Sequence, residues 1–239
     1  MKKILSILAF AAIMVSCADD FLDKVPLDKL SEDAVFNSPQ LAESYVNALY
    51  PVLPDPFQEG NISNITDESF FRYGGSSTRY MYDGRLSPST IIYISEGGSA
   101  HDSRTTVLNI WNRAYEFIYK MNYFLRAAES EDSRLEKETA DRLKGEVYFL
   151  RAWAYYNLIQ RYAGVPIIKV PHSIGGEEDF SVERSNFDDC VDFILEDLDK
   201  ADALLRSKDA TPRGRVNRDV ALALRARVTL LAASKLFND

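Results

Sequence analysis

The sequence predicts a mostly α-helical fold of paired helices, with long irregular loops that carry little β structure. Two observations support this prediction. From residue 105 onward, apolar side chains recur at spacings of three and four residues, which is the period of amphipathic helices. Residues 57–104 lack this period, and glycines interrupt a run rich in Ser, Thr, Asn and Tyr. Long irregular segments inside compact domains tend to be functional, so a binding site is expected there.

Composition and charge exclude several classes of protein. The chain has 239 residues, of which 46% are hydrophobic and 27% charged, as in ordinary globular domains. Its 28 Lys and Arg residues against 36 Asp and Glu residues give a formal net charge of −8. A broad electrostatic attraction to phosphate backbones therefore has no source, and we expect no nucleic-acid partner. No stretch approaches the roughly 20 apolar residues of a membrane-spanning helix.

The first residues read as an export signal. Lys2 and Lys3 precede an apolar run over 4–15, and Ser16 and Cys17 follow it. A Cys directly after a small residue resembles the lipobox of bacterial lipoproteins, so residues 1–16 are interpreted as a lipoprotein signal peptide and Cys17 as the lipidation site. A secretory signal with an incidental Cys is the alternative. The next residues, Ala-Asp-Asp, resemble the surface-export tag of Bacteroidetes lipoproteins.

Residues 17–37 show little periodicity and are interpreted as an extended N-terminal arm after the lipidated Cys. The helical domain is expected to begin at residue 38. Ser38 is the predicted N-cap of a first helix, and Pro39 suits the first helical position because its missing N–H needs no partner there. Pro51 and the prolines after it end this helix. Within the irregular segment, Ser89 to Ser95 is the one strand-like piece.

Four further helices are predicted in chain order. The first runs from Thr105 to about Ala128, and the second stops before Gly164. Ser185 and Asp188 form a predicted capping box ahead of the third, and Asn217 caps the fourth. Their inward stripes include Trp111, Tyr115, Ile118 and Leu125; Leu143, Val147, Leu150 and Leu158; Val191, Ile194, Leu198 and Ala201; and Val220, Leu224, Val228 and Leu231. The four form two antiparallel pairs that resemble stacked tetratricopeptide-type hairpins.

Cysteine, histidine and acidic residues give no pattern typical of a catalytic or metal site. With Cys17 lipidated, Cys190 has no partner for a disulfide and is expected to be a buried, inert thiol. His101 and His172 have no neighbours at ligand spacing, so we expect no metal and no cofactor. The acids cluster on helix faces, as in Glu129, Glu131, Asp132, Glu136 and Glu138. Such runs are typical of solvated surface, and no catalytic residue is predicted.

Residues 145–166, GEVYFLRAWAYYNLIQRYAGVP, resemble the hallmark of SusD/RagB-type outer-membrane lipoproteins. In that family the motif is an acidic residue, FLRA, aromatic residues, a hydrophobic pair, an aromatic residue, Gly and Pro. The order of the flanking segments also fits, up to GRVNRDVALALRARVTLLAAS from Gly214. The chain is thereby identified as the N-terminal portion of a member of this nutrient-binding family, with residues 38–239 as a SusD-like helical domain truncated at its C-terminus. Such a truncation predicts an exposed apolar face.

The resemblance implies a function of capture rather than catalysis. Members of this family are surface lipoproteins that bind nutrient, usually glycan, and cover a SusC-like TonB-dependent transporter in the outer membrane. A lipid-anchored protein facing the cell exterior is therefore expected. Two alternatives stay open: a helical-repeat scaffold for protein partners, and the same fold with peptide cargo.

Sugar binding needs aromatic faces for the rings and planar polar groups for the hydroxyls, and the irregular segment supplies both. The triplet Thr-Asp-Glu at 66–68 resembles one that precedes a sugar-stacking aromatic residue in starch-binding relatives, and Phe71 stands four residues past Asp67. The candidate ligand-binding residues are Asp67, Phe71, Arg72, Tyr73, Arg79 and Tyr80. Alternatively, Phe71 packs the loop on the helices and Asp67 holds the loop through backbone N–H groups.

The charged and aromatic side chains of the hallmark have a structural interpretation. Glu146 and Arg151 lie on an otherwise aromatic helix, and we expect them to pair with opposite charges or backbone groups that lock helix packing. Trp153, Tyr155 and Tyr156 are expected to pack in the core and between helices. The motif thus identifies the family without locating the ligand.

Overall fold

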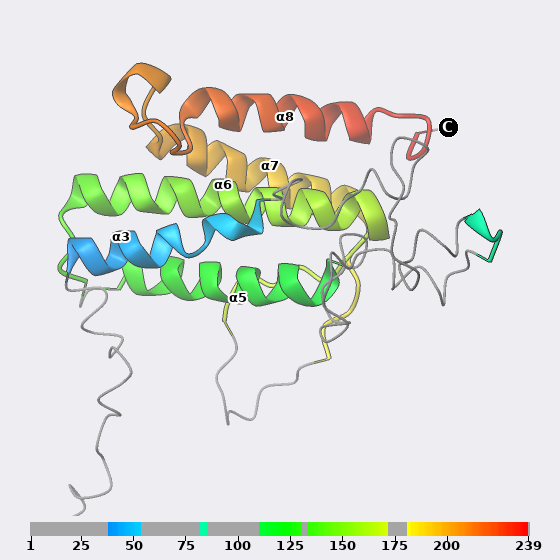
Figure 1. Cartoon of the computed structure of the whole chain (residues 1–239), viewed down its shortest axis with the longest axis horizontal. Helices are drawn as coiled ribbons and strands as arrows, with labels where there is room; N and C mark the ends of the chain where they lie inside the picture. The colour runs from blue at the N-terminus through cyan, green and yellow to red at the C-terminus, as the bar shows by residue number, and fades with distance from the viewer. Residues whose placement is uncertain (1–37, 54–81, 86–109, 131–132, 172–180, 239) are drawn as a thin grey trace, which may run out of the picture.

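A computed structural model describes residues 38–53, 82–85, 110–130, 133–171 and 181–238. Within these ranges the fold is helical, as predicted, and contains no strand (Figure 1). Its α-helices are α3 (Pro39–Asn47), α5 (Trp111–Ala128), α6 (Lys137–Tyr162), α7 (Phe187–Leu204) and α8 (Arg218–Ala232), with the 3-10 turns η2 (Tyr50–Val52) and η5 (Lys208–Ala210). The signal peptide, the arm at 17–37 and the strand-like piece at 89–95 lie outside the described residues.

Helix α3 begins and ends as the sequence predicts. The Ser38 hydroxyl accepts a hydrogen bond from the Leu41 N–H at 3.4 Å, and Pro39 occupies the first turn. The helix buries Ala42 and Val46. It ends before η2, whose second residue is Pro51. Tyr50 and Pro51 are thereby brought beside α6 and α5, because η2 contacts both helices.

Helix α6 is the centre of the described fold. It contacts α3, α5, α7 and α8, and Figure 1 shows it between α5 on one side and α7 on the other. Buried side chains therefore surround the whole helix instead of forming a single stripe. The long run from Gly145 to Tyr156, interrupted only by a partly buried Trp153, supplies most of them. The hallmark motif of the sequence is thus the core helix of this domain.

The junction between α6 and α7 corrects one prediction. Ser185 does not cap α7; the side chain of Asn186 does, because it accepts a hydrogen bond from the Asp189 N–H at 2.7 Å. The backbone of Ser185 instead pairs with the segment after α6, where its N–H donates to the Val165 carbonyl at 3.2 Å. A β-carbon at Gly164 would clash with the Ser185 carbonyl oxygen. This close backbone approach delays the start of the helix by one residue.

Helix α8 packs on α7 and leaves apolar side chains on its outer side. Asn217 caps it as predicted, accepting a hydrogen bond from the Val220 N–H at 3.2 Å. Ala221, Leu224 and Val228 are buried, whereas Leu222 and Leu230 are 47% and 74% exposed. None of the described helices is both long enough and apolar enough to cross a membrane.

Candidate functional site

The predicted ligand-binding residues lie outside the described part of the chain. This applies to Asp67, Phe71, Arg72, Tyr73, Arg79 and Tyr80, and also to Cys17. Residues 82–85 are the described piece of the irregular segment. Within it, Tyr82 is 52% exposed, and Asp83 forms an ion pair with Arg85 at 2.6 Å. The predicted sugar site therefore remains a prediction.

The first polar cluster of the described fold surrounds Arg151, the arginine of the FLRA motif. Its guanidinium makes a bidentate ion pair with Asp197 of α7, with both N–O distances at 2.7 Å. It also donates to the side-chain oxygen of Asn122 on α5 at 2.6 Å. Asn122 in turn donates to the Ile168 carbonyl at 2.7 Å. Arg151 thus links three helices and the segment after α6, which confirms the structural interpretation.

Arg151 stays protonated and positively charged although it is buried. Arg151 is 4% exposed and Asp197 is fully buried. Burial alone would lower the pKa of Arg151, but the hydrogen bonds and the charge of Asp197 raise it above its ordinary value. The guanidinium also lies over two aromatic rings, 5.5 Å from the centroid of Tyr148 and 5.1 Å from that of Phe193. The cluster therefore holds a permanent positive charge inside the helix packing.

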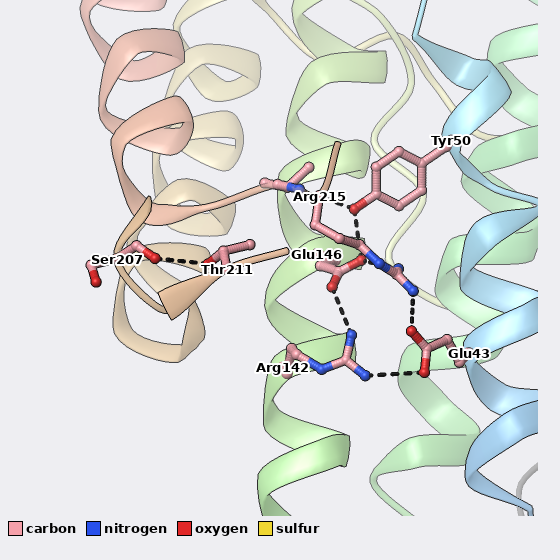
Figure 2. Close-up of polar contacts among 8 residues, drawn as sticks. Glu43, Tyr50, Arg142, Glu146, Ser207, Thr211 and Arg215 are labelled. Carbon is pink, nitrogen blue, oxygen red and sulfur yellow. Dashed lines mark hydrogen bonds and ion pairs between the residues drawn. The ribbon is translucent and has the colours of Figure 1, made fainter. Parts of the chain in front are cut away.

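The second polar cluster surrounds Glu146, the acidic residue of the motif, and is drawn in Figure 2. Its carboxylate is 1% exposed and accepts hydrogen bonds from Tyr50 at 2.7 Å, Arg142 at 3.1 Å and Arg215 at 2.7 Å. Glu43 of α3 pairs with both arginines from the solvent side. Two carboxylates and two guanidinium groups balance in charge. This cluster, too, is structural, as predicted for Glu146.

Local structure positions Arg215 and Tyr50 for this cluster. The turn before Arg215 is held by a hydrogen bond from the Thr211 hydroxyl to the Ser207 carbonyl at 2.8 Å (Figure 2). The Tyr50 hydroxyl donates to Glu146 and accepts from the Val216 N–H at 3.1 Å. Burial and the negative charge of Glu146 raise the pKa of Tyr50 to about 12. Tyr50 therefore stays a neutral donor across the physiological range.

The aromatic residues of the motif pack as predicted. Tyr155 is fully buried, and its hydroxyl accepts a hydrogen bond from the Ile168 N–H at 2.8 Å. Burial raises its pKa well above the ordinary value for tyrosine. Trp153 is partly buried and lies beside Phe149 and Tyr156. These rings hold helices together and offer no continuous exposed platform.

Cys190 confirms the prediction of a buried thiol. It is fully buried, in a free state, with its sulfur 3.5 Å from both the backbone nitrogen and the carbonyl oxygen of Val165. Burial raises the pKa of the thiol, so the thiolate needed for nucleophilic chemistry is disfavoured. Among the described residues no group of three His, Cys, Asp or Glu side chains is arranged to hold a metal ion. Glu136 and Glu138 are exposed, as expected of a solvated acidic surface.

A groove of about 280 Å³ lies between the C-terminal end of α5 and the helices α6 and α7. Residues 169–171, in the segment after α6, form one of its sides. Arg151 lies at its wall together with Tyr148 and Phe193. Its remaining charged lining residues are Arg126, Lys169, Lys200, Glu129 and Glu196. This groove could not be recognised in the sequence because its charged residues come from three helices and a connecting segment. No spacing along the chain links them, and Arg151 of the FLRA motif was expected only to pair within the helix packing.

A family model named SusD-like, with the description "Starch-binding associating with outer membrane", matches residues 20–230. The chain belongs to the SusD-like family. A search among curated proteins finds no match. The family is one of binding proteins, in agreement with the expectation of capture rather than catalysis, and its description includes association with the outer membrane.

Solved SusD-like structures share the fold. A SusD-like protein from Bacteroides fragilis is 29% identical with a TM-score of 0.62, over 87% of this chain and 38% of that chain. A SusD-like carbohydrate-binding protein from the same species is 22% identical with a TM-score of 0.61, over 82% and 38%. The surface glycan-binding protein A from Bacteroides fluxus is 18% identical with a TM-score of 0.53, over 81% and 40%. The chain spans less than half the length of these relatives.

Proposed function

We propose that this SusD-like protein is a surface lipoprotein that binds a glycan nutrient and delivers it to a TonB-dependent transporter of the outer membrane. The observation that carries the proposal is the family match over residues 20–230, whose description combines starch binding with the outer membrane. The names of two structural relatives, a carbohydrate-binding and a surface glycan-binding protein, support glycan as the cargo.

The N-terminal sequence supports the location. Lys2 and Lys3, the apolar run and Ser16 before Cys17 form the lipoprotein pattern, and a lipid on Cys17 would anchor the chain in the outer membrane facing the exterior. The transporter is proposed as the partner because the resemblance to SusD/RagB lipoproteins implies it. The described helices form one packed scaffold for such an assembly, since α6 contacts each of α3, α5, α7 and α8.

The proposed sugar site is the aromatic segment that contains Asp67, Phe71, Arg72, Tyr73, Arg79 and Tyr80. An aromatic ring such as Phe71 stacks on the apolar face of a sugar ring, and carboxylate and guanidinium groups bind its hydroxyls. The two polar clusters on α6 are unsuited to stacking on a sugar ring. The charged groups around Glu146 pair with one another, and the Arg151 guanidinium lies over the rings of Tyr148 and Phe193.

Calorimetric titration of a soluble Cys17→Ser form against plant, host and microbial glycans tests the proposal. We expect binding of at least one glycan, and we expect Phe71→Ala to weaken it about tenfold. Stacking of a nucleic-acid base on an aromatic side chain is worth about 1–3 kcal/mol, and we expect a sugar ring on Phe71 to contribute an amount near the lower end of that range. Tyr119→Ala is the matched control, because Tyr119 is an aromatic residue that is 39% exposed on α5 and is not among the predicted ligand-binding residues.

Two results would count against the proposal. Folded protein that binds no glycan in the panel would overturn glycan capture and favour peptide cargo or a protein scaffold. Binding that Phe71→Ala and Tyr119→Ala affect equally would remove the site from the predicted segment.

A further inference from the structure

The groove beside Arg151 differs from a sugar-stacking platform because cations already cover its aromatic rings. Arg151 and Lys200 lie 5.5 Å and 5.4 Å from the centroid of the Tyr148 ring. Arg151 and Lys169 lie 5.1 Å and 5.3 Å from that of Phe193. These distances are within the range of cation–π attraction, which fixes the cations in place. The rings therefore serve to position positive charge and leave little free face for a neutral sugar.

Three cations of the groove, Arg126, Arg151 and Lys169, have N–H groups that could bind a ligand. Arg151 has five N–H donors, and its three hydrogen bonds to Asp197 and Asn122 leave two. Neither Arg126 nor Lys169 forms an ion pair with any residue in the part of the chain that the structure describes. Both are exposed at the mouth of the groove. An incoming acceptor would thus meet donors at the wall and at the rim.

The acids of the groove do not cancel this charge. Glu196 is paired with Lys200 at 2.7 Å, and Glu129 accepts a hydrogen bond from the Tyr148 hydroxyl at 3.1 Å. The groove is lined by four cations, Arg126, Arg151, Lys169 and Lys200, and by two acids, Glu129 and Glu196. If Asp197, the partner of Arg151, is added to the acids, the cations are still in excess by one. The chain as a whole has the opposite balance, with a formal net charge of −8. A local positive excess in an acidic protein concentrates anions at this place.

We propose that this groove binds the carboxylate or sulfate group of a small anionic ligand. Arg126 and Lys169 contact the anion from the rim, and the two remaining N–H groups of Arg151 bind it at the wall. The volume of about 280 Å³ lies just below the range of roughly 300–1,000 Å³ that is typical of ligand pockets, so the groove suits one sugar-acid ring or a molecule of similar size. None of these groove residues belongs to the proposed glycan-binding set at residues 67–80, and the proposed anion site does not rest on that set.

Titration of the Cys17→Ser chain with D-glucuronate, D-glucose 6-sulfate and D-glucose, followed by NMR, tests this inference. We expect the two anions to bind and glucose to bind at least tenfold more weakly at this site. Lys169→Ala and Arg126→Ala should each weaken anion binding about tenfold, the equivalent of one charge-assisted hydrogen bond. Lys208→Ala and Arg227→Ala, which remove exposed cations elsewhere, are the matched controls.

The outcomes separate this inference from the proposed function. Phe71→Ala should leave glucuronate binding unchanged, whatever it does to neutral glycans. Stronger binding of glucuronate or of the sulfate ester identifies the anion that the groove prefers. The inference is overturned if glucose binds as tightly as glucuronate, or if Lys169→Ala and Arg126→Ala behave like their controls. Arg151 is left intact in these tests because its removal would strand Asp197 in the core.

Discussion

Glu146 and Arg151 are buried charges on the same helix, five residues apart, and their surroundings differ. Arg151 is paired inside the helix layer, with α5 and α7 as its partners. Glu146 is reached from the edge of the layer by Tyr50, Arg142 and Arg215. The Arg151 cluster fixes neighbouring helices against each other. The Glu146 cluster instead joins segments far apart in sequence, since its outer pair, Glu43 and Arg215, is separated by 172 residues.

The two clusters also differ in how fully they satisfy their charges. Around Glu146, two carboxylates face two guanidinium groups, and Glu43 closes the cluster toward solvent. Around Arg151, one guanidinium faces one carboxylate, and two N–H groups remain beside a groove with further cations. On the same helix, the charge of Glu146 is used entirely in packing, whereas Arg151 keeps N–H groups that could bind a ligand. A ligand is therefore expected beside Arg151 and not beside Glu146.

The largest effect is expected from Asp197→Asn. This change leaves the Arg151 charge buried without its counter-ion, and breaking a buried pair costs about 3–5 kcal/mol. Asp199→Asn on the same helix is the control, because Asp199 is 69% exposed and its pairing with Arg225 is worth about 1 kcal/mol or less. Denaturant unfolding measures both. Equal losses in the two variants would show that the Arg151 pair is no more important than a surface pair.

A smaller effect is expected from Glu146→Gln. The amide keeps the shape of the side chain, and Arg142 and Arg215 retain Glu43 and access to solvent, so we expect a loss of about 1–3 kcal/mol. Glu43→Gln, at a residue that is 41% exposed, should cost less. Denaturant unfolding of both variants and of Asp197→Asn measures how much free energy of unfolding each cluster contributes. A larger loss for Glu146→Gln than for Asp197→Asn would reverse the comparison.

The sequence predicts those parts of this fold that local patterns determine. Ser38 and Asn217 are recognised as caps because capping acts over three residues of chain. Ser185 is mistaken for a cap because its backbone is taken by Val165, a contact that only the packed junction of α6 and α7 creates. Glu146 and Arg151 are predicted to be paired, but their partners are not, since Arg215 and Asp197 lie 69 and 46 residues away.

The same reasoning explains what could be predicted of the sites. Phe71 and its neighbours are close together in sequence. Their aromatic and polar composition and the resemblance of the Thr-Asp-Glu triplet at 66–68 mark them as a candidate sugar site, and they lie outside the described residues. Arg126, Lys169 and Arg151 line one groove only because α5, α6 and the segment after α6 converge there. In the sequence, Arg126 and Lys169 look like ordinary basic residues, and Arg151 is recognised only as a charge that pairs within the helix packing.

The smallest effects on stability are expected from replacing Tyr50 of the Glu146 cluster and Tyr148 of the groove, the two tyrosines that donate hydrogen bonds to carboxylates there. Tyr50 donates to the buried Glu146, and Tyr148 donates to the exposed Glu129; burial and the carboxylate raise the pKa of each to about 12. Since the unfolded chain loses these protons near pH 10, the stabilising contribution of each is complete below pH 10 and is lost as pH rises toward 12. One such proton changes the free energy of unfolding by at most about 1.4 kcal/mol per pH unit.

Tyr50→Phe and Tyr148→Phe should therefore both flatten the alkaline fall in stability, measured by denaturant unfolding between pH 9 and pH 12. At neutral pH they should differ. Tyr50→Phe removes the acceptor of the Val216 N–H as well as a donor to a buried carboxylate, at a cost of about 1–2 kcal/mol. Tyr148→Phe frees only Glu129, which solvent reaches, so its cost at neutral pH should be smaller. Equal costs at neutral pH would mean that the closed cluster around Glu146 depends on Tyr50 no more than the open groove depends on Tyr148.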